Sequence, residues 1–200
     1  GWLDGARLYA DSFVDRPGTH GLPFTYPPFA TILFSLLSLA GDTAAQVVMI
    51  VMSYLCVTAV AWLVLRSLGV AARVPIACAF AMTVWIAEPF WATLGYGQVN
   101  LLLVLLVVAD CLAVRDKRFR GLLVGVAAAI KLTPAVFILF FLFRREYRAA
   151  GNVVAGFVGC GAIAWALAPT DSREYWFGAL TDPARPGSLA YARNQSIRGV

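Results

Sequence analysis

The sequence predicts an all-α integral membrane protein, and its composition and its pattern of apolar stretches both support this. Of its 200 residues, 60% are hydrophobic and only 14% are charged, and the mean hydropathy is +0.76. A soluble domain carries roughly 25% charged residues. Long apolar stretches alternate with short basic loops. A soluble fold of this length could not bury so much apolar surface, so the excess is expected to face lipid or other membrane helices.

The apolar stretches define the expected domain organisation. A transmembrane module is predicted over residues 44–168, with helical segments at 44–65, 74–87, 99–114, 121–143 and 149–168. At 1.5 Å per residue the first of these is about 33 Å long, enough to cross roughly 30 Å of hydrocarbon. Residues 27–40 form a shorter apolar segment, predicted to be an interfacial or re-entrant helix at the end of an external region, 1–43. Residues 169–200 form a second external segment.

The positions of the basic residues predict the orientation. They cluster in three loops: Arg66 and Arg73; Arg115, Lys117, Arg118 and Arg120; and Arg144, Arg145 and Arg148. The excess of Lys and Arg in short cytoplasmic loops places all three clusters inside the cell. The two terminal regions then lie outside and carry most of the acidic residues. We therefore expect a multi-pass protein of the plasma membrane whose polar chemistry lies on the extracytoplasmic face.

The segment 121–143 has a basic cluster at each end, which leaves two interpretations. A straight, proline-kinked helix would place one cluster outside the cell. A broken hairpin that turns near Lys131–Pro134 would keep both clusters inside, and this is the favoured interpretation. Pro134 has no backbone N–H to donate, and it biases Thr133 away from the helical conformation, so a break at this point is physically reasonable.

Lys131 is the most informative single residue. An ammonium group between apolar runs is costly in hydrocarbon unless it faces a partner or a water-filled cavity. At the tip of a hairpin it would suit a lipid-linked phosphate, and the alternative is a structural ion pair. Asp110 lies near the predicted cytoplasmic end of the helical segment 99–114, and it is expected to pair with the basic loop that contains Arg115.

Neutral polar groups collect on the predicted outer face. Tyr26 lies in a proline-rich stretch, where it could anchor the chain at the membrane interface or contact a ligand. Gln98 and Asn100 offer donors and acceptors suited to sugar hydroxyls or phosphate oxygens, with helix capping as the alternative. Asn194 and Gln195 lie in a C-terminal stretch that mixes aromatic, basic and amide side chains, a weak carbohydrate-binding signal.

Several classes of chemistry lack their sequence signals. The chain contains no phosphate-binding loop motif, no dinucleotide-binding fingerprint and no Ser/His/Asp arrangement. The cysteines, Cys56, Cys78, Cys111 and Cys160, all lie in apolar runs without metal-site spacing. We therefore expect neither a metal nor a cofactor. The net charge of +5 is a membrane topology signal and not a sign of nucleic-acid binding, because the basic residues lie in short loops.

Five motifs, taken in order, resemble glycosyltransferase family 87 of the GT-C superfamily: LPFTYPPFA (22–30), GYGQVNLLL (95–103), GVAAAIKLTPAVF (125–137), YW (175–176) and NQSIRG (194–199). The resemblance covers nearly all of the chain. It implies a GT-C-like polytopic helical bundle that acts as an inverting α-mannosyltransferase. Such an enzyme takes mannose from a polyprenyl-phosphate carrier and adds it to a glycolipid or lipoglycan acceptor on the extracytoplasmic side.

The resemblance also implies roles for individual residues. An aspartate of the first external loop would be the general base; it is expected upstream of Gly1, with Asp4 as a secondary candidate, so the chain is read as an internal fragment. Lys131 would bind the donor phosphate. The sugar or acceptor site would be lined by Tyr26, Gln98, Asn100, Asn194 and Gln195. Two other functions remain open: a lipid-carrier transporter or flippase, and a non-catalytic membrane protein of the cell envelope.

Overall fold

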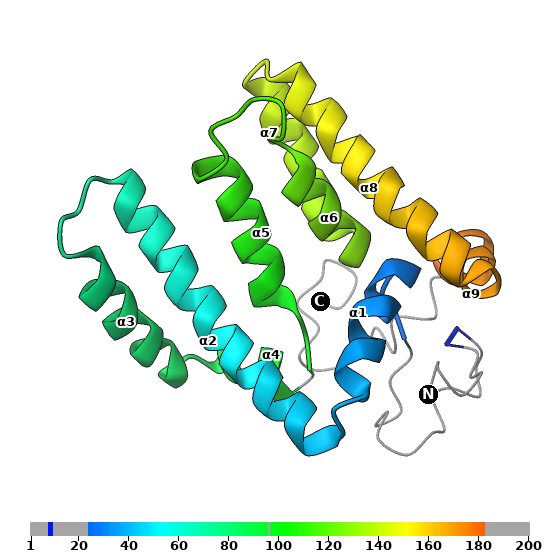
Figure 1. Ribbon diagram of the computed structural model, residues 1–200, viewed down its shortest axis with the longest axis horizontal. Coiled ribbons are helices and arrows are strands. Elements are labelled where there is room, and N and C mark those ends of the chain that lie inside the picture. Colours follow the sequence, from blue (N-terminus) through cyan, green and yellow to red (C-terminus); the bar gives the residue numbers. More distant parts are fainter. Residues whose placement is uncertain (1–7, 10–23, 96, 183–200) are drawn as a thin grey trace, which may run out of the picture.

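The computed structural model describes residues 8–9, 24–95 and 97–182. Over these ranges the chain is built from helices and connecting segments, with no β-strand. Helices α3, α2, α5, α6 and α8 follow one another across the molecule, each in contact with the next (Figure 1). α1 packs across α6 and α8 near one end of this row. The described part of the molecule is therefore an all-α assembly.

The bounds of the elements are as follows. The α-helices are α1 Pro28–Ser38, α2 Asp42–Ser67, α3 Arg73–Thr83, α4 Glu88–Gly95, α5 Asn100–Leu112, α6 Leu122–Ile130, α7 Phe137–Phe143, α8 Tyr147–Leu167 and α9 Pro169–Glu174. Short 3-10 segments occupy Val84–Ile86 (η3) and Thr133–Val136 (η4), and a π-helical turn follows α9 at Tyr175–Ala179 (η5).

The helices differ from the predicted segments in two places. α4 lies in a stretch for which the sequence analysis predicted no helix, and α9 with η5 lies in the segment 169–200, for which none was predicted either. Both helices have a proline in their first turn, where its fixed φ suits the helix and its missing N–H leaves no bond unmade. A proline in the first turn is a sequence signal for the start of a helix, and it is not visible in the pattern of apolar runs.

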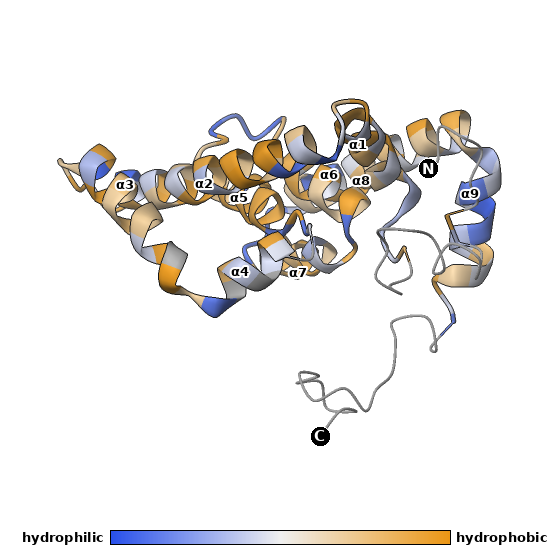
Figure 2. Ribbon diagram, turned by 90° about the horizontal axis from the view of Figure 1, so that it is seen from below, coloured by the Kyte–Doolittle hydropathy of each residue, from blue (hydrophilic) through white to orange (hydrophobic). Residues whose placement is uncertain are grey.

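Two of the described helices are long and apolar enough to cross a membrane, α2 with 26 residues and α8 with 21. The predicted segment 74–87 is divided between α3 and η3, and α5 has 13 residues, or about 20 Å of helix. On α2 the side chains of Val51 and Leu55 are 51% and 64% exposed, so an apolar surface faces outward. Figure 2 shows apolar residues along the helices and hydrophilic ones mainly in the connections and around α9. These features fit membrane association.

The chain reverses direction within residues 121–143. α6 ends at Ile130, Lys131 is extended (φ −150°, ψ 131°), and η4 begins at Thr133 with Pro134 in its first turn. α7 then returns, so that the Arg120 guanidinium and the Glu146 carboxylate, from the two ends of the segment, form an ion pair of 3.0 Å. The described structure thus has a broken helix that turns back, rather than a straight kinked one.

Glycines allow α6 and α8 to pack closely. A Cβ on Gly125 would overlap the backbone carbonyl of Val153, and one on Gly156 would come within 2.9 Å of the Leu122 carbonyl oxygen. Small residues at such crossings let two backbones approach each other, as in many membrane helix pairs. The core that surrounds this crossing includes Val124, Ile130 and Phe141, all 2% exposed or less. The crossing therefore fixes the position of the broken hairpin against α8.

Asp110 does not pair with the basic loop as predicted. Its carboxylate is fully buried and accepts hydrogen bonds from the backbone N–H groups of Gly121 (2.6 Å) and Val124 (2.9 Å). The side chain therefore caps the amino terminus of α6 from α5, where free N–H groups and the positive end of the helix dipole favour an anion. The prediction was wrong because this helix terminus reaches Asp110 only through the tertiary fold.

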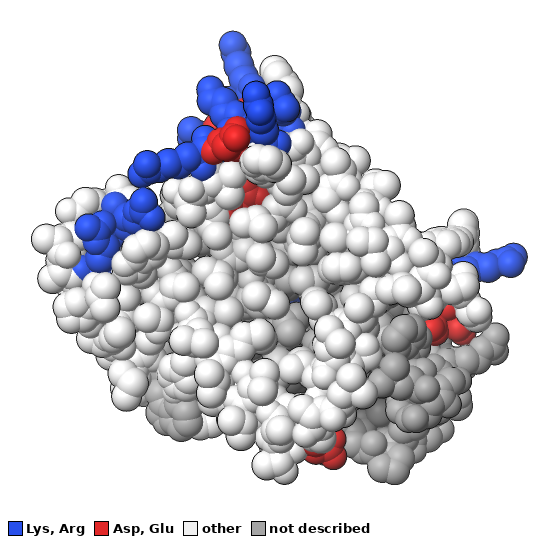
Figure 3. All heavy atoms as spheres, in the orientation of Figure 1, with Lys and Arg blue, Asp and Glu red and all other residues white. Residues whose placement is uncertain are grey.

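Charge is segregated between the two edges of the row, at opposite ends of the helices. Most of the described Lys and Arg side chains gather at one edge of the molecule (Figure 3), formed by the connections α2–α3, α5–α6 and α7–α8; Lys131 and Arg173 of α9 lie elsewhere. We call this edge the basic end. Asp42, Glu88 and Asp171 lie at the first residues of α2 and α4 and in the first turn of α9, at the opposite end. The candidate site lies toward that opposite end.

Candidate functional site

Lys131 lies at the break between α6 and η4. Its ammonium group donates a hydrogen bond to the Asn100 side-chain oxygen (3.0 Å) and lies 5.7 Å from the centroid of the Tyr26 ring. Among the residues that the structure describes, no acidic side chain forms an ion pair with it. An amide and an aromatic face stabilise the ammonium without neutralising it. The structural ion pair considered from the sequence is thus not found within the described residues, and the positive charge stays available.

The Asn100 amide extends this contact to a third side chain. It donates to the Gln98 side-chain oxygen (2.6 Å) while its own oxygen accepts from Lys131. The residue that caps α5 is Val99, which has no side-chain capping bond, so the Asn100 amide is not used as a helix cap. Its orientation is set by Lys131 and Gln98 together. The structure therefore brings Lys131, Asn100, Gln98 and Tyr26 into one cluster, which we call the Lys131 cluster.

Tyr26 connects the Lys131 cluster to the segment before α1. Its backbone carbonyl accepts a hydrogen bond of 2.7 Å from the Tyr9 hydroxyl, and its ring packs edge-on against Phe34 of α1. Burial raises the pKa of the Tyr26 phenol above its ordinary value of 10.0, although a hydrogen bond with the Val99 backbone lowers it in part. The phenol therefore stays neutral at physiological pH and offers a neutral hydroxyl beside the cation.

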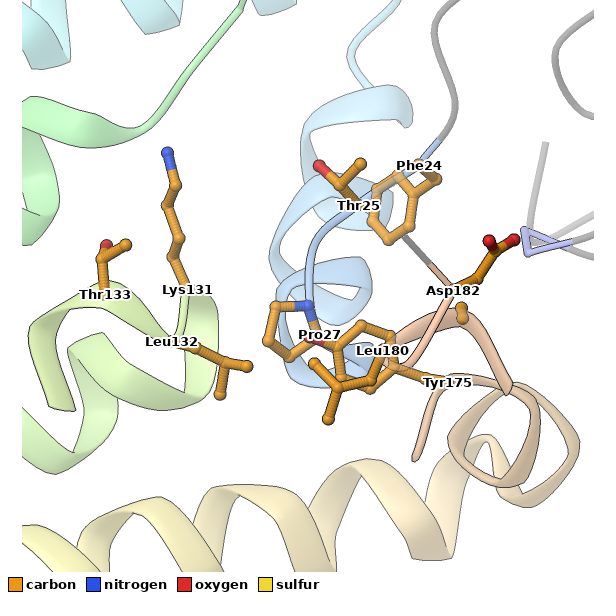
Figure 4. Close-up of a pocket in the computed structure, with 10 residues that line it drawn as sticks. Phe24, Thr25, Pro27, Lys131, Leu132, Thr133, Tyr175, Leu180 and Asp182 are labelled. Carbon is orange, nitrogen blue, oxygen red and sulfur yellow. The ribbon is translucent and has the colours of Figure 1, made fainter. Parts of the chain in front are cut away.

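A cavity of about 230 Å³ opens beside Lys131. Three segments that are far apart in the sequence converge on it (Figure 4). The lining residues are Phe24, Thr25 and Pro27 from the stretch before α1, Lys131, Leu132 and Thr133 from the helix break, and Tyr175, Ala179, Leu180 and Asp182 from η5 and the residues after it. Hydroxyl groups, the Asp182 carboxylate and apolar side chains line the cavity, and a basic side chain stands at its edge. Such a lining suits a small polyhydroxy group, with the basic side chain available to a phosphate attached to it.

Four polar residues that line this cavity are not among the site residues predicted from the sequence: Thr25, Thr133, Tyr175 and Asp182. Thr133 follows Lys131 by two positions and Tyr175 belongs to the YW pair, so the motifs contained both without indicating a role. Tyr175 packs against the Tyr9 ring, with 5.3 Å between centroids, and burial raises the pKa of its phenol to about 12. The predicted site residues Asp4, Asn194 and Gln195 lie outside the described residues.

A second cavity, of about 310 Å³, begins at the Lys131 cluster; its lining is mostly apolar, and we call it the apolar groove. It shares Asn100 with that cluster and Thr133 with the polar cavity, and it continues between α5 and α7. Its remaining lining is aliphatic or aromatic: Leu103, Val104, Val107, Val108, Pro134 and Phe137. A cation, a polar cavity and an apolar groove therefore adjoin one another. Within the described part of the chain, no group of three or more His, Cys, Asp or Glu residues could hold a metal ion.

Comparison of the chain with known proteins identifies its family. The model of glycosyltransferase family 87 matches residues 24–200. The chain is 37% identical, over its whole length, to a polyprenol-phosphate-mannose-dependent alpha-(1-2)-phosphatidylinositol mannoside mannosyltransferase of Mycobacterium tuberculosis, and it covers 50% of that protein. It is 35% identical to the protein of the same name in Mycolicibacterium smegmatis, of which it covers 48%.

A third relative differs in its named acceptor. The chain is 36% identical, over 98% of its length, to a polyprenol-phosphate-mannose-dependent alpha-(1-2)-phosphatidylinositol pentamannoside mannosyltransferase of Mycolicibacterium smegmatis. The chain spans about half the length of these curated relatives. No solved structure matches it. The family match covers most of the sequence, including every residue of the Lys131 cluster, and this chain therefore belongs to glycosyltransferase family 87.

Proposed function

We propose that this chain is the part of a membrane mannosyltransferase that binds a polyprenyl-phosphate mannose donor. Membership of glycosyltransferase family 87 and the activities after which the relatives are named support this activity. Those relatives act on phosphatidylinositol mannosides, so a glycolipid of this class is the proposed acceptor. The single observation that carries the proposal is the uncompensated ammonium of Lys131 between a polar cavity and an apolar groove.

The position of Lys131 matches the chemistry of a lipid-linked phosphate. A phosphodiester anion would gain a charge-assisted contact with the ammonium without displacing a carboxylate. As the bond from the anomeric carbon to the phosphate oxygen breaks, negative charge grows on the leaving phosphate. A fixed cation at that place stabilises the developing charge more than the ground state, which is how such a group raises the rate. Lys131 is therefore proposed as the residue that stabilises the leaving phosphate.

The two cavities would accommodate different parts of the donor. The polar cavity, at about 230 Å³, is below the roughly 300–1,000 Å³ of complete small-molecule sites, so it would hold a headgroup and not the entire donor. The apolar groove follows α5 from Asn100 to Val108, about 12 Å of helix. It would receive the first isoprenoid units of the carrier. Tyr26, Gln98 and Asn100 are proposed to contact the phosphate or sugar, and Asn194 and Gln195 to contribute from beyond the described residues.

The proposed orientation places the basic end in the cytoplasm and the Lys131 cluster toward the extracytoplasmic side of the plasma membrane. Its support is the positive-inside rule and the position of most of the described Lys and Arg side chains at one edge (Figure 3). In this arrangement several of the described helices cross or enter the bilayer. The shorter apolar helices lie within it by packing against α2 and α8, which are long enough to span it. The base that activates the acceptor hydroxyl is proposed to be an aspartate of the first external loop.

The role of Lys131 is tested by Lys131→Ala and Lys131→Arg in the full-length protein, with Arg73→Ala as a control that removes a cation from the basic end. Donor affinity and turnover are measured with polyprenyl-phosphate mannose in lipid nanodiscs. Lys131→Ala is expected to lower turnover on the order of 10²-fold, as for the loss of one transition-state donor. Lys131→Arg should recover part of the loss, and Arg73→Ala should leave both quantities unchanged. Wild-type affinity and turnover in Lys131→Ala would refute the assignment.

A further inference from the structure

A second charged cavity lies at the basic end, on the opposite side of the molecule from the Lys131 cluster. It has a volume of about 430 Å³ and lies between the α5–α6 connection and the start of α8. Its lining residues are Lys117, Arg120, Arg145, Glu146, Tyr147, Arg148 and Ala149. The proposed transferase chemistry uses none of them. We call it the basic cavity.

Most of the positive charge around the basic cavity is uncompensated. The only acid in its lining, Glu146, forms ion pairs of 3.0 Å with both Arg120 and Arg144. The side chains of Lys117, Arg145 and Arg148 are exposed, and within the described residues no acid pairs with them. Three cations that converge on one cavity without counter-charge form a site for a phosphate-bearing anion.

The backbone at Arg145 adds an independent observation. Arg145 follows the end of α7 with φ 58°, the single non-glycine residue with positive φ among the described residues. Its N–H bonds to the Leu142 carbonyl (2.9 Å), and the next N–H, of Glu146, bonds to the Phe141 carbonyl (2.8 Å). This is a Schellman helix end, a position that strongly favours glycine because it lacks a Cβ. An arginine here carries a strained backbone and directs a guanidinium to the basic cavity.

The surroundings of the basic cavity match the boundary of a bilayer. Phe119, Phe143 and Tyr147 flank the cations and are 59%, 86% and 67% exposed. Aromatic rings and snorkelling basic side chains are enriched where membrane helices meet the lipid headgroups. Leu142 and Val154, on α7 and α8, expose further apolar surface away from the cavity. A ligand with a phosphate headgroup and acyl chains would contact both kinds of surface at once.

We infer that the basic cavity binds the headgroup of an anionic membrane phospholipid, with Lys117, Arg145 and Arg148 as its phosphate contacts. This site is distinct from the donor site and does not depend on the transferase activity. Its occupant would anchor the α7–α8 connection at the membrane surface and so hold the broken hairpin, which ends at this connection. A lipid is favoured over a free phosphate because the aromatic and aliphatic surface adjoins the cations.

The test uses the full-length protein in detergent micelles, titrated with short-chain phosphatidylglycerol and phosphatidylcholine, with bound lipid counted by native mass spectrometry. Arg145→Gly removes one cation and relieves the strained backbone, so the variant is expected to fold at least as well as wild type. Its phosphatidylglycerol affinity should fall about fivefold, as for the loss of one cation near an anionic lipid surface. Lys117→Gln with Arg148→Gln should lower it further, about 25-fold.

The matched control is Arg66→Gln with Arg73→Gln, which removes two cations from the same end but outside the cavity. It should leave phosphatidylglycerol binding within twofold of wild type. An equal loss in this control would overturn the proposal, because binding would then reflect diffuse surface charge. Wild-type affinity in Arg145→Gly would overturn it as well. Complete competition by glycerol phosphate at the same concentration as the lipid would identify a soluble-phosphate site and refute the lipid.

Discussion

The Lys131 ammonium donates its hydrogen bond to the amide oxygen of Asn100. In many proteins a buried lysine pairs with a carboxylate instead. Asn100 donates to Gln98 and accepts from Lys131, so its orientation is fixed, while the ammonium keeps its net charge. Two neutral groups, the Asn100 amide and the Tyr26 ring, contact the cation, and the Gln98 amide contacts Asn100. The arrangement lowers the cost of placing a lysine among apolar helices without neutralising its charge, which leaves that charge for the anionic ligand proposed above.

Replacement of Asn100 by Asp tests this interpretation directly. The introduced carboxylate would lie about 3 Å from the ammonium, pair with it and repel a donor phosphate. We expect donor affinity to fall at least tenfold in Asn100→Asp, and by less in Asn100→Ala, which leaves the cation free. Both affinities are measured by equilibrium binding of the polyprenyl-phosphate donor. Equal affinities for the two variants would show that the net charge at this point does not matter.

Single residues also show where sequence reasoning fails. Lys131 could be singled out because a lysine within an apolar run has few explanations. Asp110 has the same appearance in the sequence, yet its carboxylate caps α6 through the Gly121 and Val124 N–H groups. Both are charged groups in apolar stretches, and only the partners brought by the fold distinguish the proposed ligand site at Lys131 from the helix cap at Asp110. Those partners lie 11 to 31 residues away in the chain.

Among the elements, the crossing of α6 and α8 positions the site. α6 carries Lys131 at its carboxyl end, and Gly125 lies against the α8 backbone with no room for a Cβ. The glycine-rich composition of α8 is typical of closely packed membrane helices. Which glycines are needed could not be known, because Gly151, Gly159 and Gly161 of the same helix have open space around them.

The helix crossing gives a prediction about stability. Gly125→Ala would force the two backbones apart and is expected to destabilise the protein by about 1–3 kcal/mol, as for other overpacked positions. Gly159→Ala should be neutral or slightly stabilising, since alanine favours helix more than glycine does. Thermal unfolding of both variants in the same detergent measures the difference. A melting temperature for Gly125→Ala at or above that of Gly159→Ala would contradict the packing described here.

The helix break illustrates what an element-level pattern predicts. Pro134 and the basic loops on both sides favoured a hairpin over a kinked span, and the described chain does turn back to form the Arg120–Glu146 ion pair. The same reasoning did not anticipate α4 or α9, because their short lengths give no clear periodicity. The residues at which helices begin and end depend on local backbone geometry, which cannot be inferred from hydropathy.

For the whole molecule, the segregation of charge predicts the orientation of α2. Its ends are exposed at Thr43 and Ser67, roughly 36 Å apart along the helix. In a variant whose native cysteines are replaced by alanine, Thr43→Cys should react with a membrane-impermeant maleimide on intact cells. Ser67→Cys, at the basic end, should react only after permeabilisation. Labelling of both positions from outside would contradict a membrane-spanning α2, and the reverse pattern would invert the proposed orientation.

The sequence by itself determined that this protein is helical and apolar, where its charges lie and that it resembles glycosyltransferase family 87, because each of these depends on composition and on residues close together in the chain. Only the tertiary structure decided which polar groups meet. The Lys131 cluster joins Tyr26, Asn100 and Lys131, and the adjoining polar cavity adds Tyr175, from four separate segments. The reason is physical: a buried or half-buried charge is defined by its partners, and packing between distant helices chooses them.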